Sequence, residues 1–224
     1  MLVHRWDTPT DDDEWTSFLI AQGFGHLVAS GGRDREVPVI VPTQFVLAGT
    51  DVLLHLARPN PIWGAIDENP LVVLSVAGDW AYIPSAWKTI GDEDPRRGIP
   101  TTYYGAVQLT ARAEIIDDPE AVAGVLRSQL GRLEPDSDVI DPIDHGARLG
   151  QIRGLCLHVI EVKAKFKYGG NVDEAHRLAV AERLADRDGP GDAAARGHLV
   201  DRLDQPDPRP GSSVTSSGTS QPNT

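Results

Sequence analysis

Runs of alternating apolar residues constrain the fold of this chain more than any other feature. In the longest run, every second position from Val107 to Ile115 is apolar. A period of two places those side chains on one face of a strand and leaves the other face free to be polar. Glycines at 31–32 and at 49 separate the earlier apolar runs, which predicts that the first strands form an antiparallel meander. Strands are expected at residues 26–30, 37–41, 44–47, 52–56, 71–77, 80–83, 107–115 and 155–166.

Apolar residues at helical spacing predict helices between these strands. The first helix starts near the pair Thr10 and Asp13, which resembles a capping box, and ends at Gly23. Proline is favoured in the first turn of a helix, and polar residues that precede it can cap the free N–H groups. The remaining helices are expected after Asn60–Pro61, from Pro119 with Asp117 or Asp118 as the cap, near residues 143–153 and over residues 173–187.

The composition changes near residue 188. Residues 1–187 carry the strand and helix patterns, and we interpret them as one cofactor-binding domain. Residues 188–224 are rich in Gly, Pro, Asp and Ala and then in Pro, Ser, Thr and Gly. A segment with so few apolar side chains cannot offset the entropy of ordering it, so we expect a disordered tail.

Charge and cysteine content exclude several classes of protein. The formal net charge is -12, which would repel a phosphate backbone, so we expect no nucleic-acid partner. The single cysteine, Cys156, excludes a disulfide framework and a cysteine-based metal cluster within one chain, and it is expected to be a small buried residue. Because no apolar stretch is long enough to span a membrane and the N-terminal region is acidic, we expect a cytoplasmic protein with no membrane partner.

Two segments place polar and aromatic residues where a strand meets a proline turn. The first is His55–Pro61 and the second is Ile99–Gly105. Strand ends and the loops beside them are where a rigid β scaffold usually presents side chains to a ligand. The two segments together predict a cofactor pocket.

Four segments, in this order, carry a resemblance to a known family. They are Leu54–Trp63 (LHLARPNPIW), Ala81–Trp87 (AYIPSAW), Ile99–Tyr104 (IPTTYY) and Ile115–Pro119 (IIDDP). The chain resembles the PaiB-like proteins of the flavin-binding split-barrel superfamily from Met1 to about Asn171. The resemblance implies an α+β fold, a six-stranded split β-barrel with flanking helices, and a homodimer with cofactor pockets at the subunit interface.

The segments Pro100–Tyr104 and Lys165–Asn171 differ from those typical of PaiB-like proteins, and the chain is most similar to the haem-dependent piperazate synthase branch of the family. That branch converts N5-hydroxy-L-ornithine into L-piperazate, forming an N–N bond and releasing water. The resemblance implies a cyclase with heme b, or FMN as the alternative cofactor. The alternative functions are an FMN-binding negative transcriptional regulator and a flavin-dependent reductase. Because the sequence indicates neither a basic surface nor a helix-turn-helix, direct action on DNA is not favoured.

The resemblance makes His55 the expected axial ligand of the haem iron, since a neutral imidazole in an apolar wall is a good iron ligand. Arg58 could bind a carboxylate of haem or of the amino-acid substrate. Thr101, Thr102 and Lys163 could bind a propionate or phosphate group. The alternatives are a hydrogen-bonded structural role for His55 and a surface ion pair for Arg58, and His158 is the rival iron ligand.

The expected catalytic residues lie in the second segment and in the last strand. Tyr103 or Tyr104 could hydrogen-bond the substrate oxygen, and Lys165 or Lys167 could take a proton from the substrate amine. The alternative for whichever tyrosine faces inward is core packing. The alternative for the lysines, which with Lys163 share one face of the strand, is protection of a strand edge.

The remaining candidate residues have structural interpretations. The histidines at 26, 145 and 176 are expected to be structural or exposed, and Trp63 and Trp87 are expected to anchor packing. Gly169–Gly170 predicts a turn and not a phosphate loop, because no suitable fingerprint follows it. The sequence shows no nucleophile elbow, no zinc-ligand spacing and no paired-carboxylate signature.

Overall fold

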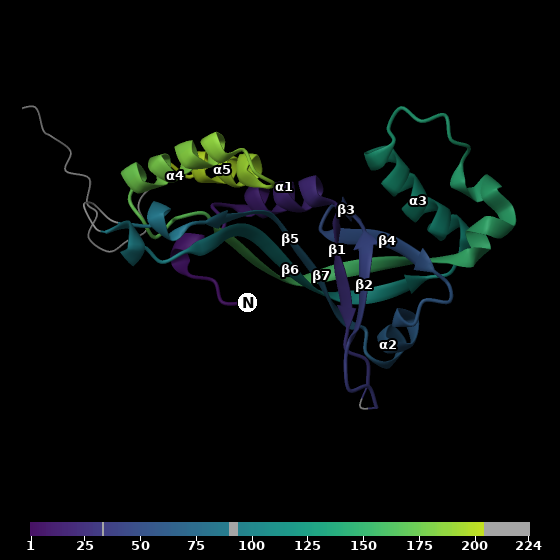
Figure 1. Ribbon diagram of the computed structural model, residues 1–224. Helices are drawn as coiled ribbons and strands as arrows, with labels where there is room; N and C mark the ends of the chain where they lie inside the picture. The colour runs from purple at the N-terminus through teal and green to yellow at the C-terminus, as the bar shows by residue number, and fades with distance from the viewer. Residues whose placement is uncertain (33, 90–93, 204–224) are drawn as a thin grey trace, which may run out of the picture. The chain divides into compact units, whose positions relative to one another are not determined.

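The computed structural model describes residues 1–32, 34–89 and 94–203 (Figure 1). These residues form two compact units, and the interpretation of residues 1–187 as one cofactor-binding domain stays a prediction. Three strands, β5 (Leu71–Ile83), β6 (Thr101–Ile116) and β7 (Ile152–Lys167), are long enough to contribute residues to both units. Unit 1 contains residues 1–3, 8–78 and 104–166, and unit 2 contains residues 4–7, 79–103 and 167 onward.

The fold is α+β, with flanking helices on an antiparallel sheet of the split-barrel type. The sheet has seven strands in the order β2-β1-β5-β6-β7-β4-β3. One strand more than the expected six is present because the three-residue β3 adds a strand at one edge. The four shorter strands are β1 (Phe24–Ala29), β2 (Val39–Gln44), β3 (Val46–Ala48) and β4 (Asp51–Ala57).

The expected meander of the first four strands is wrong. Strand β1 pairs with β2 and β3 pairs with β4, but β2 and β3 lie at opposite edges of the sheet. Phe45 lies between the end of β2 and the start of β3 and belongs to neither strand. Its side chain is buried, and its backbone N–H donates to the carbonyl of Gly23. The other side of β1 pairs with β5, and the other side of β4 pairs with β7. These partners are distant in the sequence, and alternation alone does not specify which strands pair.

The core of unit 1 follows the predicted alternation. On β6 the side chains of Val107, Leu109 and Ala111 are fully buried, while the intervening positions are more exposed. Helix α1 (Asp12–Gln22) contributes Phe18, whose ring meets that of Phe166 edge-on at 5.5 Å between centroids. The burial of one face of each strand thus supplies the apolar contacts that hold the sheet to its helices.

The first helix ends as predicted and begins one residue later than the capping pair suggested. Asp11, not Thr10, is the N-cap, and its side chain accepts from the backbone N–H of Glu14 at 2.9 Å. Thr10 donates its own backbone N–H to Glu14 Oε2 at 2.7 Å. Gly23 closes the helix at a φ of 57°, in the left-handed region that glycine adopts without steric cost.

Two further helices flank the sheet of unit 1. In α2 (Ile62–Glu68) the Ile62 N–H donates to the side chain of Asn60, and in α3 (Pro119–Leu133) Asp118 caps the first turn, as expected. The 3-10 segment η4 (Pro142–Gln151) follows α3 and packs against it (Figure 1). Helix α3 also packs on β3 and β4, so it lies close to the predicted iron ligand on β4.

Unit 2 corrects the expectation of a disordered segment from residue 188. Residues Asp192–Asp201 form helix α5, which packs on α4 (Glu174–Arg187). Ala195 and Leu199 on α5 are fully buried and lie four residues apart, one helical turn. In a segment rich in Gly and Ala, two apolar positions at this spacing do not by themselves predict a helix. Residues 204–224 of the expected tail lie outside the described residues. Unit 2 also contains the 3-10 turns η1 (Arg5–Asp7), η2 (Ser85–Trp87) and η3 (Pro95–Arg97).

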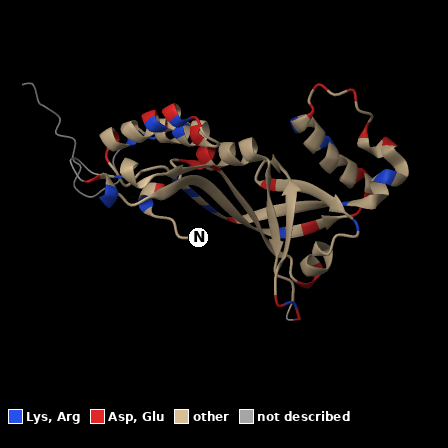
Figure 2. Cartoon of the chain, in the orientation of Figure 1, with Lys and Arg blue, Asp and Glu red and all other residues tan. Residues whose placement is uncertain are grey.

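Acidic and basic side chains are interspersed along the helices, and the strands are mostly uncharged (Figure 2). In the part of the chain that the structure describes, no helix combines the length and apolarity needed to cross a bilayer.

Candidate functional site

Strand β4 holds His55 on the face of the sheet opposite the core. The flanking residues Leu54 and Leu56 point into the core, so His55 is half-buried on the other face. Helix α3 covers this position. Gln129 of α3 is 5% exposed, and its Oε1 lies 2.6 Å from Nδ1 of His55.

This contact fits one tautomer of His55. Oε1 of Gln129 accepts, so Nδ1 of His55 is the donor in this arrangement, and in the neutral imidazole Nε2 then carries the lone pair. No hydrogen-bond partner of Nε2 is found among the described residues. A histidine that ligates a metal usually donates its other ring N–H to a fixed acceptor, which orients the ring. The donor set at His55 therefore fits a histidine that would bind iron through Nε2.

A glycine on the neighbouring strand lets α3 approach this face. Gly154 of β7 is directly opposite His55 in the β4–β7 register. A Cβ atom at Gly154 would lie 3.2 Å from side-chain atoms of both Val125 and Ile116. Glycine thus provides the space in which Val125, and with it Gln129, packs close to the sheet.

Two cavities lie where α3 and η4 meet the end of β7. The first has a volume of about 230 Å³ and the second about 270 Å³, and Leu149 and Ile152 line both. Ile152 lies on the same face of β7 as Gly154, two residues away. The first cavity is otherwise lined by Leu126, His145 and Arg148, an apolar space with an imidazole and a guanidinium at its boundary.

Arg58, at the boundary of the second cavity, is engaged by protein groups. Its Nη1 forms an ion pair with Asp117 at 2.9 Å, and its Nε and Nη2 donate to the carbonyls of Gly150 and Ile152. Arg153 also pairs with Asp117. The pKa of Asp117 is lowered, most strongly by its hydrogen bonds from Arg153 and also by those from Arg58. Arg58 therefore joins the end of β4 to η4 and β7, which is the ion-pair alternative considered for it.

Three other predicted residues belong to unit 1. Lys165 is 8% exposed, and its Nζ donates to the carbonyl of Leu2 at 3.0 Å and lies 5.8 Å from the ring centre of Tyr104. Lys163 forms an exposed ion pair with Glu161. Tyr104 and Lys165 are thus brought together, whereas Lys163 is held at the surface.

The predicted residues Thr101, Thr102, Tyr103 and Lys167 belong to unit 2. Lys167 donates to Oγ1 of Thr101 at 2.6 Å, and Thr102 is half-buried beside this pair in the sequence. Nearby, the pKa of Lys88 is lowered by burial and by the positive charge of Lys167. This group offers two ammonium groups and a hydroxyl, a donor set suited to an anion.

Tyr103 is a core residue of unit 2. Its side chain is 2% exposed, and its ring meets that of Tyr168 edge-on at 6.3 Å. Its hydroxyl has no hydrogen-bond partner among the described residues, and burial raises the pKa of the phenol to about 12. These contacts match the packing alternative for Tyr103.

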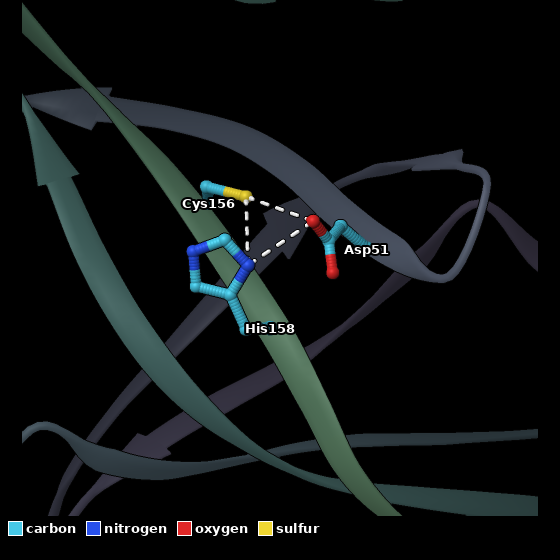
Figure 3. A group of neighbouring side chains, drawn as sticks. All are labelled: Asp51, Cys156 and His158. Atoms are coloured by element: carbon cyan, nitrogen blue, oxygen red, sulfur yellow. Dashed lines mark hydrogen bonds and ion pairs between the residues drawn. The ribbon is translucent and has the colours of Figure 1, made fainter.

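His158, the rival iron ligand, faces two carboxylates. Its Nδ1 lies 3.1 Å from Oδ2 of Asp51, and its Nε2 lies 2.8 Å from Oε2 of Glu114. Hydrogen bonds to Glu114 and then to Asp51 raise the pKa of His158. Cys156 lies beside this pair on the same face (Figure 3). Both nitrogens of His158 are engaged, whereas one nitrogen of His55 is not.

The remaining structural interpretations agree with the contacts found. Trp63 donates its indole N–H to the carbonyl of Ala57 and packs under Arg153, and Trp87 packs under Arg187. His26 is exposed, His145 borders the first cavity, and burial lowers the pKa of His176. Gly169 begins a turn, with the Val172 N–H donating to its carbonyl.

Sequence patterns did not indicate Gln129 or Asp51 as site residues. Gln129 is a polar residue on the otherwise apolar inner face of α3, three positions after Leu126. A polar residue at an apolar position of the helical repeat is the one sequence feature that could have indicated it. Asp51 could not be assigned, because only the register of β4 with β7 places it opposite His158.

Comparisons with known proteins agree with this fold. Over 211 residues the chain is 23% identical to the protease synthase and sporulation protein PAI 2 of Bacillus subtilis, covering 91% of this chain and 98% of that protein. The FAD and heme binding protein of Mycobacterium smegmatis has a TM-score of 0.58 at 17% identity, with 72% of this chain and 73% of that one covered. The flavocytochrome Anf3 of Azotobacter vinelandii has a TM-score of 0.57 at 22% identity, with 75% of this chain and 73% of that one covered. Residues 2–163 match the family described as "Putative FMN-binding domain", and the chain therefore belongs to this PaiB-like family of split-barrel proteins.

Proposed function

We propose that this chain is a haem protein with His55 as the iron ligand, and that it converts N5-hydroxy-L-ornithine into L-piperazate. One observation carries the proposal: Gln129 accepts from Nδ1 of His55 at 2.6 Å, which leaves the Nε2 lone pair for a metal. The likeness to the FAD and heme binding protein supports it, because a chain of this fold bears that name.

The proposed reaction closes a ring within one substrate. A bond forms between the α-nitrogen and N5, the N5–O bond breaks, and the oxygen leaves as water with protons from the α-amine and the medium. No external oxidant or reductant is needed for this balance. Bound haem would supply an iron centre that acts as a Lewis acid or electron relay toward the hydroxylamine.

The side chains of the protein would orient the substrate and handle its protons. Lys165 and Tyr104 lie close together, and we assign them to the substrate amine and the substrate oxygen. Arg58 would have to exchange Asp117 for a substrate or propionate carboxylate, whereas Arg148 already borders the apolar cavity under α3. Holding both nitrogens of a flexible chain in contact supplies much of the acceleration in such reactions.

A second candidate is FMN binding, and the pair Lys167–Thr101 favours it. An ammonium and a hydroxyl 2.6 Å apart, with Lys88 nearby, could bind the FMN phosphate together with Thr102. The family description also refers to FMN. The chain would then be a flavin-dependent reductase or a flavin-binding regulator.

Absorption spectroscopy separates the two candidates. We expect the purified protein to bind haemin with a Soret band, and the His55→Ala variant to lose the shift that accompanies ligation. The matched control His145→Ala, at a histidine that borders the cavity, should retain it. A Soret band unchanged in His55→Ala would exclude His55 as the iron ligand, and a flavin spectrum in a protein that binds no haemin would favour the second candidate.

The activity is tested by incubating the haem-loaded protein with N5-hydroxy-L-ornithine. We expect a product lighter by one water in the mass spectrum, which is absent with His55→Ala. We further propose that the protein acts as a homodimer, which light scattering on the purified protein tests. A haem-loaded protein that leaves the hydroxylated ornithine unchanged would refute the cyclase activity, even if His55 ligates iron.

A further inference from the structure

Three potential metal ligands gather on the outer face of the sheet of unit 1. Asp51 is directly opposite His158 in the β4–β7 register, and Cys156 lies two residues from His158 on the same face of β7. Figure 3 shows the three side chains pointing toward one another. One oxygen, one sulfur and one nitrogen, all within 4.8 Å of one another, therefore converge from two hydrogen-bonded strands.

The distances between these atoms match a tetrahedral cation site. Sγ of Cys156 lies 3.8 Å from Oδ2 of Asp51 and 3.9 Å from Nδ1 of His158, and the nitrogen and oxygen are 3.1 Å apart. Zinc with bonds of roughly 2.3 Å to sulfur and 2.0 Å to nitrogen and oxygen separates sulfur from the other two by about 3.5 Å and nitrogen from oxygen by about 3.3 Å. Each separation therefore needs to change by less than about half an ångström, within the reach of small χ rotations.

Glu114 of β6 orients the imidazole for this purpose. Its Oε2 lies 2.8 Å from Nε2 of His158, so Nε2–H donates to the carboxylate and Nδ1 faces Asp51 and Cys156. A carboxylate that holds the far nitrogen of a ligating histidine is the usual outer partner of a zinc site. A cation on Nδ1 would replace the hydrogen bond from His158 to Asp51.

The cluster is only partly buried, so a cation can reach it from solvent. Cys156 is 9% exposed at the base, while the side chains of Asp51 and His158 are 35% and 45% exposed at the opening. The soft sulfur ligand is thus shielded from solvent, and the harder oxygen and nitrogen ligands meet the arriving ion.

We propose that Asp51, Cys156 and His158 bind one divalent cation of the zinc class, with Glu114 positioning His158 and a fourth coordination position open to water. A thiolate with an imidazole and a carboxylate selects zinc or cobalt over magnesium and calcium, which prefer oxygen ligands alone. On binding, the thiol of Cys156 and the Nδ1–H of His158 each release a proton to the medium, and Nε2 of His158 keeps its proton on Glu114. The bound cation would join β4 to β7, and it is independent of the iron site proposed at His55.

Titration with cobalt(II) under reducing conditions tests the site in the full-length protein. We expect a thiolate-to-cobalt charge-transfer band in the near ultraviolet that saturates at one equivalent and is displaced by zinc(II). Cys156→Ser should abolish the band, and Glu114→Gln should weaken cobalt binding about 10- to 100-fold without changing the stoichiometry. His145→Ala and His55→Ala should bind cobalt as the unaltered protein does.

Two results would overturn the proposal. One is the absence of the band at saturating cobalt, and the other is a band that persists unchanged in Cys156→Ser. If Cys156→Ser does not fold, as judged by circular dichroism, Asp51→Asn decides: an unchanged cobalt affinity in that variant refutes the site. A failure here leaves the haem titration unaffected, because His55 supplies no ligand to this cation.

Discussion

Replacing Gln129 by Leu removes the acceptor of the His55 Nδ1–H while nearly preserving side-chain volume. The lost bond is 2.6 Å long and lies beneath α3, where Gln129 is 5% exposed. A donor left without a partner in such a place costs about 1–3 kcal/mol. Because each kcal/mol lowers Tm by roughly 2–4 °C in a chain of this size, a loss of about 2 kcal/mol should lower Tm by about 4–8 °C.

The same substitution should weaken haem binding. Without Gln129 the imidazole of His55 can rotate and can carry its proton on either nitrogen, so the lone pair of Nε2 is no longer presented in one direction. Loss of the outer partner of a metal-bound histidine typically costs 10- to 100-fold in affinity, so we expect about that decrease in a Soret titration. Ser128→Ala, at the adjacent exposed position of α3, should change neither Tm nor haem affinity.

A double-mutant cycle with His55→Leu shows whether the two effects share one cause. If the hydrogen bond is responsible, Gln129→Leu should cost much less stability in the His55→Leu background than in the unaltered protein. Equal costs in both backgrounds would show that Gln129 stabilises α3 by another route. Gln129 would then not be the group that orients His55 for a metal.

Three other substitutions test separate parts of the structure. Gly154→Val should push α3 off β7 through contact with Val125, cost about 1–3 kcal/mol in urea unfolding and reduce haem affinity; unchanged stability would show that α3 can shift freely. Tyr103→Phe removes a buried hydroxyl without a partner in the described structure, so stability should be unchanged or higher by up to about 1 kcal/mol, and a large loss of turnover at normal stability would instead identify a catalytic phenol. Asp192→Asn breaks the 2.5 Å ion pair between Asp192 and Arg187, which lowers the pKa of Asp192 in the folded protein. The carboxylate therefore stabilises the fold at pH values above its ordinary pKa, and this contribution is lost as the pH falls through the lowered pKa. The variant should be about 1–3 kcal/mol less stable at pH 7 and should approach the unaltered protein on acidification; a difference that is constant with pH would contradict this assignment.

Much of the secondary structure could be predicted because its determinants are local. Asp118 caps α3 where Pro119 opens it, and Gly23 ends α1, since each depends only on neighbouring backbone groups. The alternation from Val107 to Ile115 correctly predicted one buried face of β6. Helix α5 was not predicted because its fully buried apolar residues, Ala195 and Leu199, stabilise it only when α4 packs against it.

The candidate site was predicted only in part, because its residues come from different elements. The resemblance to the PaiB-like proteins made His55 a candidate ligand, but its hydrogen-bond partner Gln129 is 74 positions away. Tyr103 and Tyr104 are adjacent in the sequence, yet Tyr103 is buried in unit 2 whereas Tyr104 faces Lys165 in unit 1. Adjacent residues of a strand point to opposite faces, and the sequence does not state which face is inside.

By itself, the amino-acid sequence determined the approximate limits of most elements, because periodicity, caps and turns act over a few residues. The class of fold and the family followed from its resemblance to the PaiB-like proteins. Only the tertiary structure decided that the first two hairpins occupy opposite edges of the sheet, that His55 presents Nε2, and that Asp51, Cys156 and His158 converge. Those outcomes depend on strand register and on the packing of α3. Both are set by contacts between residues far apart in the chain, whose free energy no local pattern contains.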